Sequence, residues 1–161
     1  MTLDLDNLRE GWDFEAKLAT GRDGKGALPK SMWETYSAMA NTHGGLILLG
    51  VKERADGSLE VKGLDNVEKV ERDLWNCLAN REKVSCDLLD RDRVEQHEIE
   101  GKTLLLLRIP RADRRQRPVY INNNPLRGTY FRTHEGDRHA TEGRVRRMFS
   151  DASERPPDSE I

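Results

Sequence analysis

The residues from Leu28 to Lys52 constrain the fold of this chain more than any other stretch. Pro29 suits the first turn of a helix, where its missing N–H has no partner to lose. Apolar residues then recur at helical spacing, at Met32, Trp33, Tyr36, Met39 and Ala40. Gly44 and Gly45 can adopt positive φ and end the helix. Because the apolar run from Leu46 to Val51 follows directly, the stretch predicts a helix, a glycine turn and a central strand buried on both faces.

Shorter patterns predict the elements on either side of this stretch. Alternation from Glu10 to Leu18 predicts a half-buried strand, and Asp56-Gly57 predicts a hairpin turn. A second helix, capped by Asp65 or Asn66, carries its apolar residues from Val67 to Leu78. Further strands are predicted at residues 59–63, 85–90, 94–99, 103–109, 118–121 and 128–132. A last helix follows Thr141, with Val145, Met148 and Phe149 facing inward. This order predicts an α+β fold, with one mixed β-sheet and two or three packed helices.

The length of 161 residues suits one domain, which we place at residues 1–150. Residues 151–161 are polar and proline-rich, so they are predicted to be a disordered linker or tail. We see no signal peptide and no apolar run near the roughly 20 residues of a membrane span. Cys77 and Cys86 lack metal-ligand spacing and suit a reducing compartment. These features predict a cytoplasmic protein with no membrane partner.

Positive charge is concentrated in one part of a chain whose net charge is −2. Residues 108–147 hold 11 arginines, no lysine and four acidic residues, which suggests a polyanion partner for that face. Arginine can grip phosphate with two hydrogen bonds, and a tyrosine ring can stack on an unpaired base. The candidate nucleic-acid contacts are Arg114, Arg115, Arg117, Tyr120, Arg127, Tyr130, Arg132, Arg138, Arg144 and Arg147. Solvated surface for the arginines and sheet packing for the tyrosines are the alternatives.

Four residues form a candidate catalytic cluster, Glu10, Glu15, Lys17 and Glu53. If the ends of the first and central strands lie close together, the three carboxylates could bind Mg²⁺ or Mn²⁺. The metal would activate a water, and Lys17 would stabilise developing negative charge. The alternative is that Glu15 and Lys17 form an ordinary ion pair on the wet face of an edge strand.

Five short motifs occur in an order that resembles the Schlafen AlbA_2 domain: Trp12–Lys17, Ala38–Gly45, Gly50–Glu53, Arg117–Tyr120 and Gly128–Arg132. The resemblance implies a DNA-binding module. In bacteria such a module usually stands at the N-terminus of proteins named as RecG-related ATP-dependent helicases or as transcriptional regulators. Domains of a longer parent chain would then follow it. Nuclease members of the Schlafen family use a Glu, a second Glu five residues on, and an Asp after the central strand. Glu10, Glu15 and Glu53 fall on those places, with Glu in place of Asp.

The sequence therefore predicts a module that binds DNA or RNA within a larger regulatory or helicase-related protein, with no cofactor required. A metal-dependent nuclease using Mg²⁺ or Mn²⁺ is one alternative. A homodimer or protein-interaction module that pairs through an exposed edge strand is another. The loop GRDGKG lacks the glycine spacing and the hydroxyl residue of a Walker A loop, so no ATPase motor motif is found in this chain.

Overall fold

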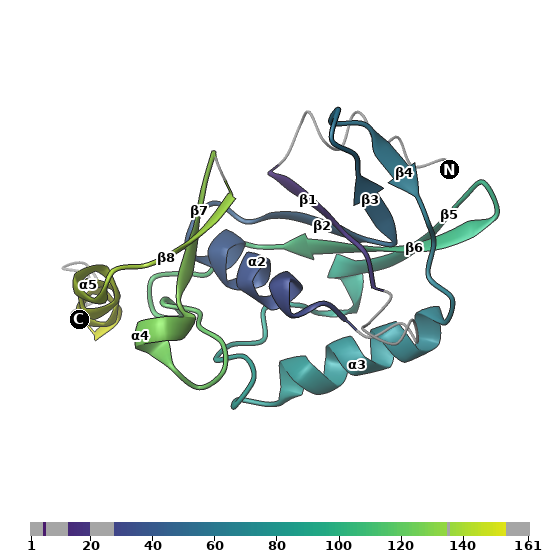
Figure 1. The fold of residues 1–161 in the computed structure, drawn as a ribbon. Coiled ribbons are helices and arrows are strands. Elements are labelled where there is room, and N and C mark those ends of the chain that lie inside the picture. Colours follow the sequence, from purple (N-terminus) through teal and green to yellow (C-terminus); the bar gives the residue numbers. More distant parts are fainter. Residues whose placement is uncertain (1–4, 6–12, 20–27, 135, 154–161) are drawn as a thin grey trace.

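The computed structural model describes residues 5, 13–19, 28–134 and 136–153. Within them the central sheet has the strand order β1 (Phe14–Lys17), β2 (Gly45–Leu49), β6 (Lys102–Ile109) and β5 (Val94–Ile99). β1 runs parallel to β2, whereas β6 is antiparallel to both of its neighbours, so the sheet is mixed. Helices α2 (Lys30–Asn41) and α3 (Val67–Ala79) cover one face of this sheet (Figure 1). The predicted α+β class is confirmed.

Smaller elements complete the described chain. The hairpin of β3 (Val51–Glu53) and β4 (Leu59–Val61) covers the other face of the central sheet (Figure 1). A second hairpin pairs β7 (Tyr130–Thr133) with β8 (Gly136–His139). The short helices are η1 (Arg91–Arg93) and α4 (Pro125–Gly128), and the last helix is α5 (Glu142–Ser153). In the residues that the structure describes, every helix is too short or too polar to cross a membrane.

The helix, glycine turn and central strand form as predicted. Gly44 has a φ of 73°, and its N–H donates to the Met39 carbonyl at 2.7 Å, which closes the C-terminus of α2. A Cβ at this glycine would lie 2.6 Å from the Ile109 carbonyl oxygen, so no larger residue fits. Leu46 and Leu48 point to one side of the sheet and Ile47 and Leu49 to the other, and each pair belongs to its own apolar cluster. The strand is therefore buried on both faces.

The predicted strand from Leu46 to Val51 is divided into two. Gly50 has a φ of 99°, and its carbonyl accepts from the N–H groups of Lys62 and Gly63 at 2.9 and 2.8 Å. The chain therefore leaves the central sheet after Leu49 and continues as β3, which pairs with β4 instead.

The prediction of a strand at residues 85–90 is wrong. This segment holds no strand, and only Val84 beside it forms an isolated bridge, with Ile121. The hydroxyl of Tyr36 donates to the Cys86 carbonyl at 2.7 Å and accepts from the Leu88 N–H at 2.9 Å. Because a side chain satisfies these backbone groups, the segment needs no neighbouring strand.

The C-terminal part differs from the prediction in four ways. Residues 118–121 form no strand, because Tyr120 and Ile121 make only isolated bridges. Thr141 caps α5 as predicted, accepting from the Arg144 N–H at 3.2 Å, and Val145 is buried. However, Phe149 is 43% exposed rather than inward-facing. The helix continues to Ser153, beyond the predicted boundary at residue 150, while residues 154–161 of the predicted tail lie outside the described residues. Strand β8 was not predicted, because its sequence GDRH has no apolar alternation.

Candidate nucleic-acid interface

Four of the predicted arginine contacts lie around one pocket at the C-terminal end of α2. The pocket has a volume of about 470 Å³. It is lined by five arginines, one carboxylate and four other residues: Arg111, Arg114, Arg117, Arg144, Arg147, Asp151, Asn41, Thr42, His43 and Met148. We call this the arginine pocket. Its positive charge is concentrated in a small concave region of a protein whose net charge is −2.

The loop that carries Arg111, Arg114 and Arg117 is fixed by backbone hydrogen bonds. The Ala112 N–H donates to the Ala40 carbonyl at 2.8 Å, which attaches the loop to the last turn of α2. Asp113 then organises the turn, because its carboxylate accepts from the N–H groups of Arg115 and Gln116 at 2.8 and 3.1 Å. These hydrogen bonds fix the backbone of the loop and therefore the positions from which Arg111, Arg114 and Arg117 extend.

Asn41 in the last turn of α2 fixes the chain that follows Arg117. Its side-chain amide donates to the carbonyls of Val119 and Tyr130, both at 2.9 Å, and its oxygen accepts from the Val119 N–H at 2.8 Å. Ser37, one turn earlier on α2, donates to the same Val119 carbonyl at 2.7 Å. Both side chains are buried, so these bonds lock the loop and β7 against the helix.

Helix α5 supplies the opposite wall of the arginine pocket. Arg144 and Arg147 are three residues apart and therefore lie on the same side of the helix. The Arg144 guanidinium also lies over the Phe131 ring, with 4.1 Å between its central carbon and the ring centroid. This cation–π contact orients Arg144 while leaving its N–H groups able to donate.

The electrostatics of the arginine pocket favour an anion. Burial lowers the pKa of Arg117, and the positive charges of Arg111 and Arg114 lower it further, while Asp113 and Asp151 oppose this. A bound phosphate would offset the mutual repulsion of these guanidinium groups and accept their N–H hydrogen bonds.

The remaining candidate contacts lie elsewhere. Arg115, Arg127 and Arg138 are exposed and do not line the arginine pocket. Tyr120 is half-buried, with its ring centroid 6.3 Å from that of Phe149. Tyr130, also a predicted contact, is only 9% exposed, and its ring packs on His139 with 4.3 Å between ring centroids. Tyr130 therefore offers little surface to a base.

Arg132 is held by three carboxylates rather than lining the arginine pocket. Its guanidinium contacts Asp13 at 3.0 Å, Glu15 at 2.9 Å and Asp137 at 2.8 Å, and the side chain is 10% exposed. Burial acts to lower the pKa of Arg132, but the hydrogen bond to Asp137 and the charges of Asp13 and Glu15 outweigh it and raise that pKa. Arg132 thus joins β7 to β1, and its N–H groups are already used.

The predicted acidic cluster is described only in part. Glu15 contacts Arg132 at 2.9 Å and Lys17 at 3.9 Å, and the Lys17 ammonium donates to the Ser31 hydroxyl at 3.2 Å. Glu53 is exposed at the end of β3, and Glu10 lies outside the described residues. No group of three or more His, Cys, Asp or Glu residues among those described could hold a metal ion. The Mg²⁺ or Mn²⁺ site formed by Glu10, Glu15 and Glu53 stays a prediction.

The sequence did not single out two further residues of the arginine pocket. Arg111 belongs to the arginine-rich segment, and the available signal was its position three residues before Arg114 and six before Arg117. His43 comes from a separate part of the chain, just after α2, and nothing in its local sequence connects it to the arginines.

Comparisons with known proteins identify the family. The Schlafen, AlbA_2 family model matches residues 10–141. The solved N-terminal domain of a Nitrosomonas europaea protein, which carries the name ATP-dependent DNA helicase RecG-related protein, is 30% identical to this chain. The match covers 85% of this chain and 88% of that one, with a TM-score of 0.58.

A second solved structure shares the fold at lower identity. The DIP2311 protein from Corynebacterium diphtheriae is 15% identical, with a TM-score of 0.56, and the match covers 89% of this chain and 25% of that one. No curated protein matches. The family model and the Nitrosomonas domain confirm the resemblance seen in the sequence: the chain belongs to the Schlafen AlbA_2 family.

Proposed function

We propose that this domain binds nucleic acid by placing backbone phosphates in the arginine pocket. The observation that carries the proposal is the convergence of five arginines, from the loop at residues 111–117 and from α5, on one pocket lined by a single carboxylate. Guanidinium groups bind phosphate oxygens in a planar, two-bonded geometry, and such contacts dominate the affinity of proteins for nucleic acids.

The chemistry of the arginine pocket predicts binding that depends little on base sequence. Phosphate contacts position a protein on nucleic acid but do not read bases. The Nitrosomonas relative is an N-terminal domain of a protein named for DNA helicases, which supports DNA as a partner and a place for this domain in a longer chain. Because guanidinium groups bind phosphates of DNA and RNA alike, both are tested below.

Fluorescence anisotropy with labelled single-stranded DNA, single-stranded RNA and duplex DNA tests this function. We expect the logarithm of the affinity to fall linearly with the logarithm of salt concentration, by about 0.7 per neutralised phosphate for single strands and about 0.9 for duplex DNA. The double substitution Arg117→Ala with Arg147→Ala should weaken binding by roughly two orders of magnitude and make the salt dependence less steep.

The matched control replaces two arginines outside the arginine pocket. Arg72 on α3 and Arg91 on η1 are both exposed and do not line it, so Arg72→Ala with Arg91→Ala removes the same charge. We expect this control to keep nearly all of the affinity and the original salt slope. Equal losses in the two double variants would mean that total charge, and not this pocket, governs binding, and would overturn the proposal.

A further inference from the structure

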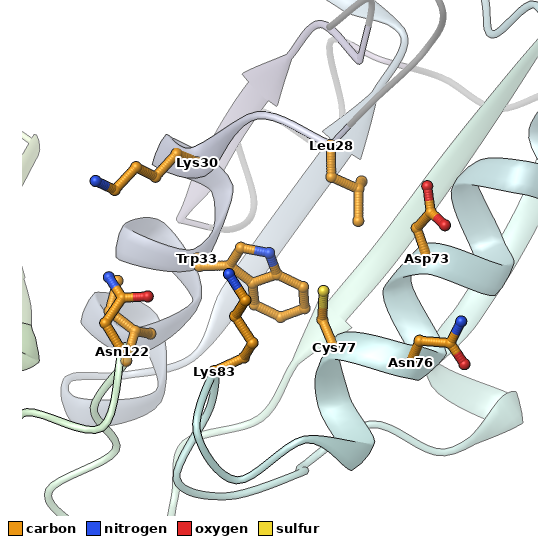
Figure 2. Close-up of a pocket in the computed structure, with 9 residues that line it drawn as sticks. Leu28, Lys30, Trp33, Asp73, Asn76, Cys77, Lys83 and Asn122 are labelled. Carbon is orange, nitrogen blue, oxygen red and sulfur yellow. The ribbon is translucent and has the colours of Figure 1, made fainter.

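A second cavity lies at the opposite end of α2, with a volume of about 580 Å³. The first turn of α2 supplies Lys30 and Trp33, and α3 supplies Asn76 and Cys77 (Figure 2). Lys83 and Asn122 come from two loops that are joined by a hydrogen bond from the Asn122 N–H to the Lys83 carbonyl at 2.9 Å. None of the residues of the arginine pocket lines this cavity.

The apolar wall of the cavity is built around an aromatic ring. Trp33 is 9% exposed, and Tyr36 packs edge-on against its buried side, with 5.6 Å between ring centroids. Figure 2 shows Leu28 and Cys77 on the same side of the indole, toward α3. Burial raises the pKa of the Cys77 thiol, so this wall stays uncharged near neutral pH. The indole edge, Leu28 and Cys77 together offer apolar contact to a flat ring.

Four of the five polar side chains that line the cavity are available to a ligand, whereas the fifth, Asp73, pairs with the Lys69 ammonium at 2.8 Å. Within the described part of the chain, the side chains of Lys30, Asn76, Lys83 and Asn122 make no hydrogen bond or ion pair. Other asparagines differ, because the side-chain oxygens of Asn66, Asn80 and Asn124 each accept a backbone N–H. The two amides and two ammonium groups at the cavity are therefore not used to stabilise turns.

We propose that this cavity binds one nucleotide. The base lies against the edge of Trp33 that lines the cavity, where apolar contact stabilises it. The amides of Asn76 and Asn122 each offer a donor and an acceptor to the edge of the base. Lys30 and Lys83 balance the charge of the phosphate. The volume of 580 Å³ lies within the range of small-molecule sites.

The nucleotide can come from two sources, a free mononucleotide or one residue of a bound strand. Both present the same base and phosphate to the cavity. The 12 residues of α2 separate the cavity from the arginine pocket by about 18 Å, since a helix rises about 1.5 Å per residue. The proposal does not depend on nucleic-acid binding at the arginine pocket.

Trp33 is a reporter for this site. The chain has three tryptophans, so Trp12→Phe with Trp75→Phe leaves Trp33 as the single emitter. We expect saturable quenching by at least one of AMP, CMP, GMP and UMP. Ribose 5-phosphate lacks the base and should bind about tenfold more weakly or worse. If the double variant does not fold, the indole N–H signal of Trp33 in nuclear magnetic resonance spectra of the unaltered chain gives the same readout.

Variants of the cavity locate the binding. Lys83→Met and Asn76→Ala should each weaken mononucleotide binding by about tenfold. Lys62→Met is the matched control, because Lys62 is exposed, pairs with Glu60 and does not line the cavity. Affinities that are equal in Lys83→Met, Asn76→Ala and Lys62→Met would overturn the proposal.

A short single-stranded oligonucleotide distinguishes the two sources. Saturation by mononucleotides supports a free ligand, whereas saturation by the oligonucleotide alone supports a residue of a bound strand. Absence of a saturable Trp33 response to either, or an equal response to ribose 5-phosphate, overturns the proposal. The variant Arg117→Ala with Arg147→Ala should keep its mononucleotide response, so this site and the arginine pocket can fail separately.

Discussion

At the scale of single residues, chemically identical arginines have different roles because of their surroundings. Arg117 and Arg132 both lie in the arginine-rich segment and were predicted to bind phosphate. Arg117 lines the arginine pocket, whereas Arg132 is surrounded by Asp13, Glu15 and Asp137. Asp13 and Glu15 precede Arg132 by more than a hundred residues in the sequence. Sequence could therefore predict the group of arginines but not which of them is neutralised by distant carboxylates.

The role of Arg132 can be measured as stability. Arg132→Ala would leave three half-buried carboxylates without their shared cation, and losing a charged hydrogen-bond partner costs about 1–3 kcal/mol. We expect urea denaturation to show a loss in the free energy of unfolding of that order. Arg127→Ala, at an exposed position, should change it by less than about 0.5 kcal/mol. Similar small effects in both variants would show that the network around Arg132 contributes little.

At the scale of elements, local signals predicted most of the structure. Helix α3 begins after Asn66 and ends before Asn80, and β5 and β6 form the predicted hairpin with β6 inside the sheet. Two of the errors arise where a distant group satisfies the backbone. Gly50 ends β2 because Lys62 and Gly63 donate to its carbonyl, and residues 85–90 are held by the Tyr36 side chain. The local sequence around Gly50 or residues 85–90 contains no pattern that predicts these hydrogen bonds to distant groups.

Tyr36 gives a prediction for the segment at residues 85–90. Burial raises the pKa of Tyr36 well above its usual value of 10.0, because the charged form is poorly solvated. A raised folded-state pKa means that stability is full below the unfolded-state pKa of about 10 and declines as pH rises above it. Tyr36→Phe removes this dependence, and it should lower stability at neutral pH by about 1–3 kcal/mol because the Leu88 N–H loses its acceptor.

Denaturation series at neutral pH and near pH 11 measure both effects. We expect the unaltered protein to lose more stability between the two pH values than Tyr36→Phe does. Tyr120→Phe is the matched control, because the Tyr120 side chain is only half-buried. Parallel pH profiles for all three proteins would contradict the role given to the Tyr36 hydroxyl.

At the scale of the whole molecule, α2 organises two separate sites. Its last turn holds the loop of the arginine pocket, and its first turn forms the aromatic wall of the second cavity. The buried side chains of Ser37 and Asn41 attach the chain around Val119 to this helix. That chain runs from Arg117, at one site, to Asn122, at the other. One helix and one segment therefore fix both sites relative to the same core.

The arginine pocket predicts that nucleic-acid binding needs no metal ion, because guanidinium groups supply the positive charge. EDTA should leave the affinity unchanged in anisotropy measurements, and adding Mn²⁺ should weaken it only as much as equal ionic strength from other salts. Analysis of the same samples on denaturing gels tests the nuclease alternative. Cleavage that requires Mn²⁺ and disappears in Glu15→Ala, with Asp92→Ala as an exposed control, would establish a metal site at Glu10, Glu15 and Glu53. Binding that is lost in EDTA would show that the arginines alone do not hold the phosphates.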